Sequence, residues 1–366
     1  MSVFEAMGAA SHEQVLFCSD PDLGLKAIIA VHSTALGPAL GGCRIYPYAS
    51  EADALRDVMR LSRAMTYKAA VAGLDLGGGK SVIIGDASVK SEALLRAFGR
   101  HVHSLGGRYL VAEDMNTSCR DMEWIARETP HVTGLSPAHG GLGEPGPVTA
   151  FGVYSGIRAA LQHRFGSPDL RGRVVSVQGL GNVGFNLLRH LHEDGARILV
   201  TDVDPARIAI AVDRYGAEGV APDAWLSTPC DVLAPCAIGG VLSATTIPLL
   251  RCEVVAGGAN NVLADESADA ERLRDRGVDL VPDFVINAGG LIAMFAEFTH
   301  GTLERAMADT ARIFDTTLAV FSRARRDGVT TMQAAVSLAE ERIAAVSRLR
   351  SHFSPSSHLH DGRPVR

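Results

Sequence analysis

Hydrophobic positions follow two different periods in the first part of the chain, and each period indicates a different kind of element. Short apolar runs separated by the turn-like Asp20-Pro21-Asp22 predict a β-hairpin. Apolar residues at helical spacing predict two helices, the first with the Ser50 hydroxyl capping its first turn. The predicted elements are strands over 15–18, 25–31 and 109–112, and helices over 51–65 and 91–105. The first part of the chain therefore mixes strands with helices.

The pattern changes after residues 134–147, where five glycines and three prolines interrupt both kinds of spacing. We place a hinge between two domains there, since 366 residues fit two domains of roughly 100–200 residues each. Beyond it, short β-branched runs alternate with helices, which is typical of a parallel sheet. The predicted strands are 174–177, 198–201, 232–233, 254–256 and 280–281, and the predicted helices are 148–162, 306–324 and 331–346. The polar tail 351–366 is predicted to be disordered.

Composition argues against several classes of partner. The net charge of −6 and the absence of long lysine or arginine runs disfavour a surface for nucleic acid or anionic membranes. Residues 232–250 carry no charge, but two prolines and two glycines interrupt them, so we expect no membrane span. Residues 1–14 lack the apolar core of a signal peptide, and the six cysteines form no C-x-x-C pair. We therefore expect a cytoplasmic protein with free thiols and no metal site.

One motif indicates a dinucleotide. Gly179-Leu180-Gly181-Asn182-Val183-Gly184 stands between a predicted strand and a predicted helix, and Asp202 ends the next strand. The three glycines permit, in order, a tight turn, close approach of the backbone to a pyrophosphate, and close packing of helix on strand. The helix N-terminus offers N–H groups to the phosphates. Asp202 can accept hydrogen bonds from the adenosine ribose and would repel a 2′-phosphate, which favours NAD over NADP.

A second glycine run, Gly77-Gly78-Gly79-Lys80-Ser81, is similar to a phosphate-binding P-loop. The loop needs a glycine at position 74, where leucine stands, so a kinase or ATPase is disfavoured. Lys80 is therefore expected to have a function other than phosphate binding. Lys68 and Asp114 also lie in apolar, glycine- and alanine-rich surroundings. A lysine removed from water has a lowered pKa and can accept a proton near neutral pH. Two such lysines and an acid indicate a catalytic site.

The chain resembles the glutamate/leucine/phenylalanine/valine dehydrogenases from about residue 14 to residue 348. Seven motifs carry the resemblance in the order found in that family. They are Leu36-Gly37-Pro38-Ala39-Leu40-Gly41-Gly42, Gly77-Gly78-Gly79-Lys80, Ala112-Glu113-Asp114, the dinucleotide motif, Ala234-Pro235-Cys236-Ala237, Gly258-Ala259-Asn260-Asn261 and Asn287-Ala288-Gly289-Gly290.

The resemblance implies an α/β protein with two domains and a cleft between them. Residues 1–140 would form the catalytic and oligomerisation domain, with the helix 331–350 packing back on it. Residues 148–330 would form a Rossmann-type, doubly wound NAD-binding domain, and the protein would be a homo-oligomer. The tail 351–366 belongs to neither domain.

The same resemblance implies roles for individual residues. Lys68 would bind the substrate carboxylate with Gly41, Gly42 and Asn261; Lys80 would activate a water, and Asp114 would exchange protons with the amine. The cofactor would contact Cys236 and Ala237, and its nicotinamide amide would be held by Thr149, Asn260 and Asn287. Hydride transfer from Cα to NAD would leave an iminium ion, to which water adds before ammonia leaves, so no metal is needed.

The implied substrate is a hydrophobic L-amino acid. Family members that use glutamate carry a lysine at the position of Leu40 and a serine at that of Met294, and both are apolar here. A glutamate side chain would leave a buried carboxylate unpaired, at a cost of roughly several kcal/mol. The candidate pocket lining is Leu40, Met65, Ala112, Leu291 and Met294.

Two alternatives stay open beside a branched-chain substrate. The stretches 12–18 and 328–331 also resemble a tryptophan dehydrogenase, and an apolar pocket separates such substrates by only about 1–3 kcal/mol. An aromatic substrate, tryptophan or phenylalanine, is therefore the second candidate. A catalytically silent dinucleotide-binding protein is the third, although Lys80 and Asp114 are both present.

Overall fold

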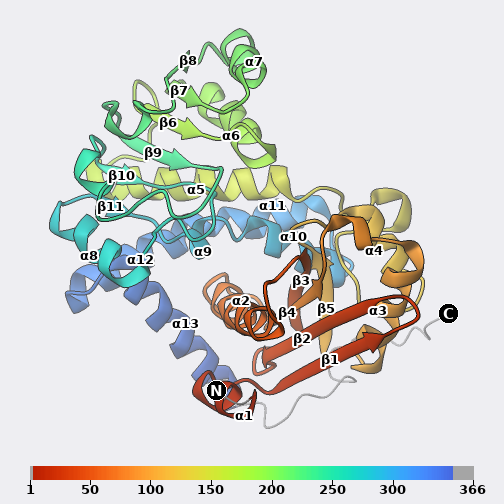
Figure 1. The fold of residues 1–366 in the computed structure, drawn as a ribbon. Helices are drawn as coiled ribbons and strands as arrows, with labels where there is room; N and C mark the ends of the chain where they lie inside the picture. The colour runs from red at the N-terminus through yellow and green to blue at the C-terminus, as the bar shows by residue number, and fades with distance from the viewer. Residues whose placement is uncertain (1–2, 349–366) are drawn as a thin grey trace. The chain divides into compact units, whose positions relative to one another are not determined.

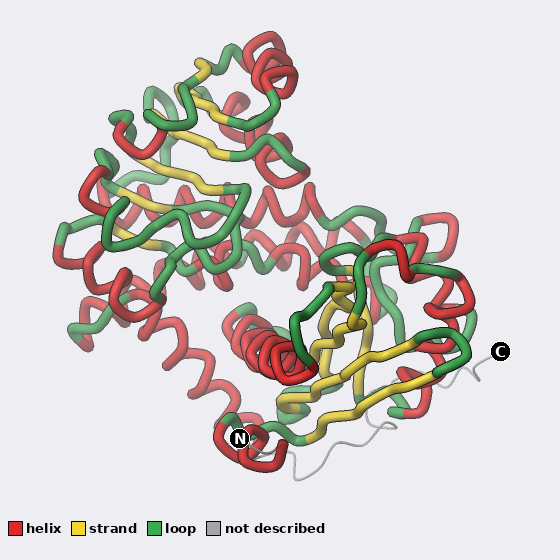
Figure 2. Tube along the Cα trace, in the orientation of Figure 1, coloured by secondary structure: helices red, strands yellow, loops and turns green. Residues whose placement is uncertain are grey.

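The computed structural model describes residues 3–348, which divide into two compact units. The first unit contains residues 3–144, 294–301 and 339–348, and the second contains residues 145–293 and 302–338. Figure 1 labels the helices and strands of both, and Figure 2 shows the strands of each unit side by side. The predicted disordered tail 351–366 lies outside the described residues.

The first unit is built on a five-stranded sheet with the order β1-β2-β4-β3-β5. β1 and β2 form the antiparallel hairpin that the sequence predicted, and β3 runs parallel to both β4 and β5. The strands are β1 (Gln14–Asp20), β2 (Leu25–Ser33), β3 (Ala39–Tyr46), β4 (Gly77–Ile84) and β5 (Tyr109–Glu113). The helices α1 (Val3–Ala9), α2 (Glu51–Val71), α3 (Glu92–Ser104) and α4 (Cys119–Ala126) complete this part.

Alternation of side chains gives the two faces of this sheet different surroundings. Cys43, Ile45 and Tyr109 face an apolar core that α3 and α4 cover. Ala30 and Val82 face the other side, where α2 packs on β2 and β4. The Ser50 hydroxyl accepts a hydrogen bond from the Asp53 N–H, so the predicted cap of α2 is confirmed.

The glycine run 77–79 lies inside β4, a strand that the sequence analysis did not predict. Each glycine fills a place where a neighbour comes too close for a side chain. A Cβ on Gly78 would lie 2.2 Å from the Thr66 backbone nitrogen of α2, and one on Gly79 would lie 2.6 Å from the Tyr109 ring. The run therefore lets helix and strand pack at close range and does not form a loop around a phosphate.

The second unit contains a six-stranded parallel sheet with the order β11-β10-β9-β6-β7-β8. Counted from the first strand of the unit this is the order 3-2-1-4-5-6 of dinucleotide-binding sheets, read from β8 to β11. The strands are β6 (Val174–Gln178), β7 (Arg197–Thr201), β8 (Glu218–Gly219), β9 (Val232–Pro235), β10 (Val254–Val255) and β11 (Asp279–Leu280).

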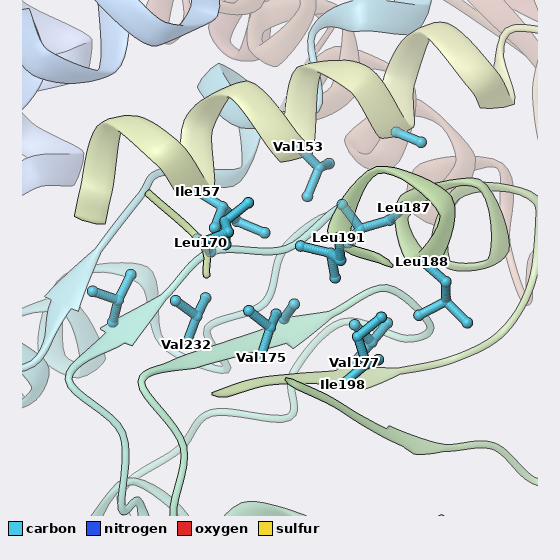
Figure 3. Packing of buried hydrophobic residues seen from close by; sticks show 14 of the residues in the cluster. Val153, Ile157, Leu170, Val175, Val177, Leu187, Leu188, Leu191, Ile198 and Val232 are labelled. Carbon is cyan, nitrogen blue, oxygen red and sulfur yellow. The ribbon is translucent and has the colours of Figure 1, made fainter. Parts of the chain in front are cut away.

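Helices surround this sheet, and both of its faces are apolar, as a parallel sheet requires. Figure 3 shows one face, where Val175 and Val232 lie under Val153, Ile157 and the leucines of α6. Leu233 and Val255 face the opposite core, which includes α8. The helices that begin in this unit are α5 (Gly146–Phe165), α6 (Asn182–Glu193), α7 (Pro205–Tyr215), α8 (Glu266–Asp275), α9 (Asp283–Ile286), α10 (Gly289–Phe298), α11 (Leu303–Ala311), α12 (Ile313–Asp327) and α13 (Thr331–Ser347). The ends of α10 and α13, from Met294 and Ala339 on, belong to the first unit.

Two regions after residue 230 can be compared with what the sequence predicted. The single helix predicted over 306–324 is divided at Arg312 into α11 and α12. The uncharged stretch 232–250 begins with the short buried strand β9, and none of the helices within residues 3–348 has the length and apolarity needed to cross a membrane.

A pair of buried histidines ties the start of the chain to α2. The rings of His12 and His32 lie 4.8 Å apart, edge to face. His12 Nε2 is hydrogen-bonded with Ser62 Oγ at 2.9 Å, and His32 Nδ1 with Thr66 Oγ1 at 2.7 Å. Burial lowers the pKa of His12, and it lowers that of His32 to about 4. Both rings are therefore neutral in the folded protein at neutral pH.

We expect these histidines to make the fold sensitive to acid. An unfolded histidine binds a proton near pH 6.5, so the contribution of a ring buried as the neutral form is complete above that pH and is lost below it. For His32 this amounts to about 2 kcal/mol between pH 6.5 and pH 5. Urea unfolding of the wild type and of His32→Gln at both pH values should show a smaller pH effect in the variant. The exposed His103, changed to glutamine, is the control; an equal pH effect in all three proteins would contradict the expectation.

Candidate active site

Lys80 and Asp114 form an ion pair on the face of the first sheet that α2 covers. Lys80 Nζ lies 3.1 Å from Asp114 Oδ1, and the Lys80 side chain is only 7% exposed. Lys80 lies in β4 and Asp114 directly follows β5, with β3 between these strands. Two strand spacings amount to about 10 Å, so both side chains must reach across β3 to meet.

The side chains of Lys80 and Asp114 meet over Gly42 of β3. The register of β3 with its neighbours places Gly42 beside Ala112 of β5 and opposite Lys80 of β4. A Cβ on Gly42 would lie 2.6 Å from the Asp114 Cβ, a distance that side-chain atoms do not adopt. Glycine at this position therefore leaves the space that the ion pair occupies.

The turn after β5 fixes the position of Asp114. The Asp114 N–H donates to Thr117 Oγ1 at 2.8 Å, and the Thr117 hydroxyl lies 2.8 Å from the Cys43 carbonyl of β3. Asn116, at a φ of 61°, donates from its side-chain amide to the Ile45 carbonyl. Side chains of this turn thus hold it against β3, and the sequence analysis had not identified them.

Burial and charge shift the pKa values of the two groups in ways that suit proton transfer. Burial lowers the pKa of Lys80, Asp114 opposes this shift, and the nearby Arg44 adds to it. Burial alone would raise the pKa of Asp114, but the positive charges of Lys80 and Arg44 outweigh it and hold that pKa below its usual range. An ionised acid therefore lies beside a lysine that loses its proton more readily than a lysine in water.

Arg44 extends the pair into a chain of alternating charges, which sequence reasoning missed. Its Nε lies 2.9 Å from Asp114 Oδ2, and its Nη1 lies 3.0 Å from Asp57 Oδ2. Asp57, in α2, also accepts a hydrogen bond from the Tyr48 hydroxyl at 2.6 Å and pairs with Arg60 at 3.1 Å. The available signal was an arginine in the middle of Ala39–Tyr46, a strand without any other charge.

The other expected substrate-binding residues of the first unit lie mainly on the same face. Alternation along β3 and β5 places Leu40, Gly42 and Ala112 with Lys80, and Leu40 and Ala112 are fully buried. Met65 and Lys68 belong to α2, which covers this face, and both are half-buried. Gly41 has its carbonyl hydrogen-bonded by the Tyr109 hydroxyl at 2.7 Å.

The other expected pocket residues are distributed over both units. Met294 lies in the part of α10 that belongs to the first unit, whereas Leu291 and Asn261 belong to the second. Asn261 has a φ of 51°, and its N–H donates to Asp283.

In the second unit, the dinucleotide motif forms the turn from β6 into α6. Gly179 has a φ of 89°, and a Cβ there would lie 2.6 Å from the Ala237 Cβ. A Cβ on Gly184 would lie 1.9 Å from the Gly179 carbonyl oxygen, so this glycine brings helix and strand together. Gly181 differs from both, because nothing lies within 4 Å of the place where its Cβ would be.

This open space suits a dinucleotide. It lies at the N-terminus of α6, a 12-residue helix, where N–H groups attract phosphate. It also lies where the chain order of the strands reverses, since β7 and β9 flank β6 on opposite sides, and such a point is where dinucleotides bind. Leu180 lies in the turn, and Asn182 and Val183 begin α6.

Asp202 follows β7 and contacts this turn directly. Its Oδ2 accepts from the Leu180 N–H at 2.6 Å, and its Oδ1 accepts from the Asp204 N–H at 2.8 Å. The carboxylate is therefore anchored beside the glycines, at the end of the strand where a ribose-binding acid is needed.

The remaining expected cofactor residues form two groups in the second unit. The Asn287 amide donates to Asn260 Oδ1 at 2.7 Å and to the Gly258 carbonyl at 3.2 Å. Thr149 lies beside Gly290, whose Cβ would be 3.0 Å from the threonine hydroxyl. Cys236 follows β9, and its sulfur accepts from the Gly258 N–H at 3.4 Å; Ala237, next to it, lies against Gly179.

Comparison with protein families finds two matches that together span most of the chain. Residues 12–131 match the Glu/Leu/Phe/Val dehydrogenase dimerisation domain. Residues 140–208 and 200–350 match the Glutamate/Leucine/Phenylalanine/Valine dehydrogenase model. The first match contains Lys80 and Asp114, and the second contains the glycine turn and Asp202.

Individual relatives match over nearly the whole length. A leucine dehydrogenase from Geobacillus stearothermophilus is 49% identical over 98% of both chains. A valine dehydrogenase from Streptomyces virginiae is 49% identical over 91% of this chain and 94% of its own. The crystal structure of L-tryptophan dehydrogenase from Nostoc punctiforme is similar with a TM-score of 0.86 and 46% identity, over 94% of this chain and 99% of that one.

We expect Gly42→Ala to destabilise the first unit because the added methyl group must displace Asp114 or β3. Overpacking of this kind costs about 1–3 kcal/mol. Gly8→Ala is the matched control, since nothing lies within 4 Å of a Cβ there. Urea unfolding should give a lower midpoint for Gly42→Ala only. Equal midpoints for the two variants would show that Asp114 and β3 accommodate the methyl group.

Proposed function

The chain belongs to the Glu/Leu/Phe/Val dehydrogenase family, and we propose that it interconverts a branched-chain L-amino acid and its 2-oxo acid with release or capture of ammonia, using NAD. The observation that carries the proposal is the Lys80–Asp114 pair, in which an acid and a lysine of lowered pKa contact each other in a buried site. Family membership makes the chain an amino acid dehydrogenase that depends on a nicotinamide dinucleotide.

The two groups would divide the proton transfers of deamination. The bound nicotinamide dinucleotide supplies the hydride acceptor for the substrate Cα. Lys80, as the neutral amine, would take a proton from the water that adds to the resulting iminium carbon. Asp114 would exchange protons with the amine, which must be neutral to release hydride and protonated to leave as ammonia. Lys68 would hold the substrate carboxylate, helped by the Gly41 backbone.

The pair also predicts the direction of the pH dependence. The water step needs Lys80 without its proton, so the rate of deamination should rise as the pH rises through the lowered pKa of Lys80. Asp114 stays ionised across that range because Lys80 and Arg44 hold its pKa down.

Apolar residues beside the pair support a hydrophobic substrate. Leu40 and Ala112 share the sheet face of Lys80 and contribute no charge that could pair with a side-chain carboxylate. Met65 of α2 and Met294 extend this apolar set within the same unit. Leucine and valine dehydrogenases among the relatives favour a branched-chain substrate. The tryptophan dehydrogenase, at similar identity, keeps an aromatic substrate as the second candidate.

Asp202 supports NAD as the dinucleotide. Its carboxylate is fixed by two backbone N–H groups at the end of β7, where it would accept from the ribose hydroxyls and repel a 2′-phosphate. We further propose residues 1–140 as the substrate-binding and oligomerisation domain of a homo-oligomer, because residues 12–131 match a dimerisation domain.

The proposal is tested by the absorbance of reduced cofactor with valine, leucine, isoleucine, phenylalanine, tryptophan and glutamate, each with NAD and with NADP. We expect the highest kcat/KM with a branched-chain substrate and NAD, and little turnover of glutamate. Substrates that differ by a methylene should differ by about 10–200-fold. Lys80→Ala and Asp114→Asn should lower kcat by about 10²–10⁴-fold while NAD still binds. Absence of turnover with every hydrophobic amino acid would refute the proposed activity.

The glycine turn allows a separate test of the cofactor site. Gly181→Ala should leave the urea midpoint unchanged, because its Cβ meets no atom, yet weaken NAD binding by about tenfold or more, since the methyl group would stand where the pyrophosphate approaches. Gly184→Ala should instead lower stability, because its Cβ would collide with the Gly179 carbonyl. Fluorescence titration with NADH and urea unfolding measure the two effects. Unchanged NADH affinity in Gly181→Ala would place the cofactor elsewhere.

A further inference from the structure

Arg44 connects the Lys80–Asp114 pair with α2 through two side-chain hydrogen bonds: its Nε donates to Asp114 and its Nη1 donates to Asp57. The two donors of one planar group therefore serve two carboxylates from different elements. We propose that Arg44 is a positioning residue, which holds one oxygen of Asp114 so that the other stays directed at Lys80, and that Asp57 anchors Arg44 for this purpose. The proposal deepens the function proposed above and rests on it.

Geometry supports the division of the two Asp114 oxygens. Oδ2 accepts from Arg44 at 2.9 Å, and Oδ1 lies 3.1 Å from Lys80 Nζ, so each oxygen has its own cation. A carboxylate bound at one oxygen by a planar donor has a fixed rotation about its last bond. Without Arg44, the carboxylate could rotate to intermediate angles about its last bond, and Asp114 would no longer have one defined orientation toward the reacting amine.

Asp57 gives Arg44 a fixed position of its own. It lies in α2, is 18% exposed, and accepts hydrogen bonds from Arg44, Tyr48 and Arg60. Lys80, Asp114, Arg44 and Asp57 alternate in sign and have no net charge together. Such a network is costly to bury unless every member is paired, so removal of one member affects the orientation of the others.

Arg44 also acts on Lys80 through its charge. It lowers the pKa of Lys80 and of Asp114, in each case together with other groups. Besides the pair itself, the titratable or charged groups of α2 and of the strands β2 to β5 are Lys26 and His32 of β2, Cys43, Arg44 and Tyr46 of β3, Tyr109 and Glu113 of β5, and Glu51, Asp53, Arg56, Asp57, Arg60, Arg63, Tyr67 and Lys68 of α2. Among these, Arg44 contacts Asp114 directly. Loss of its charge should therefore raise the pKa of Lys80.

The experiment compares Arg44→Gln, Arg44→Lys and Arg60→Gln in the full-length enzyme. Arg60 pairs with the same Asp57 but is 59% exposed, so it serves as the matched control. We expect Arg44→Gln to lower kcat by about tenfold to a hundredfold with an unchanged KM for NAD, as small misplacements of a reacting group do. In a plot of kcat/KM against pH, the acid limb of Arg44→Gln should move to higher pH. Arg44→Lys should keep the limb near its wild-type position and recover only part of kcat, because an ammonium group cannot contact both carboxylates in the same way.

A second measurement reports on Lys80 without any substrate. Acetic anhydride acetylates only neutral amines, so the pH at which Lys80 is half-labelled, measured by mass spectrometry of its peptide, follows its pKa. The pH of half-labelling should be higher in Arg44→Gln than in the wild type and in Arg60→Gln. This shift would stand even if the enzyme turned over none of the amino acids tested, so failure of the proposed function is distinguishable from failure of this inference.

Two outcomes would overturn the role of Arg44. One is a wild-type kcat, pH profile and labelling curve in Arg44→Gln while Asp114→Asn is inactive. The other is an equal loss in Arg60→Gln, which would assign the effect to Asp57 and the packing of α2. If Arg44→Gln does not fold, Asp57→Asn takes its place: Arg44 then keeps its charge but loses its anchor, so kcat should fall while the acid limb does not move to higher pH. A wild-type kcat in Asp57→Asn would then reject the proposal.

Discussion

The ion pair between Lys80 and Asp114 places several requirements on its neighbours in the first unit. Two opposite charges meet across an intervening strand, where Lys80 is almost completely buried and Asp114 is largely buried. Burial of a charge is costly unless it is paired and its remaining hydrogen-bonding capacity is used. The glycine at position 42, the hydroxyl of Thr117 and the guanidinium of Arg44 each meet one part of that requirement. The site therefore depends on neighbours that need not touch a substrate.

Glycine serves two opposite purposes in the molecule. At Gly42 and Gly184, other atoms of the protein lie close to the place that a Cβ would take. They belong to Asp114 in the first case and to the Gly179 carbonyl in the second. At Gly181 the corresponding space is open, at the N-terminus of a helix where phosphate is favoured. The first kind of glycine determines how tightly the fold packs. The second kind leaves room for a ligand, so the two should be distinguished before a glycine-rich motif is assigned a function.

The sequence predicted most elements of the fold and both residues of the Lys80–Asp114 pair. The elements and residues that it did not predict were missed for physical reasons. The alternating β/α pattern after residue 174 identified the parallel sheet, because both of its faces are buried and its strands are rich in Val and Leu. The strand Gly77–Ile84 was missed because glycine weakens a strand when judged by propensity alone, whereas here close packing requires it. Arg44 and Asp57 were missed because their contact depends on a helix crossing the sheet, which local spacing does not encode.

The charged network also bears on substrate choice. Each carboxylate of the chain Lys80, Asp114, Arg44 and Asp57 already has a cationic partner, and each cation has a carboxylate. A second acid, brought in on a substrate side chain, would have to displace one of these partners or lie unpaired beside Leu40 and Ala112. An apolar side chain requires neither. We therefore expect glutamate to be disfavoured both by this network and by the apolar residues around it, in line with the branched-chain substrate proposed above.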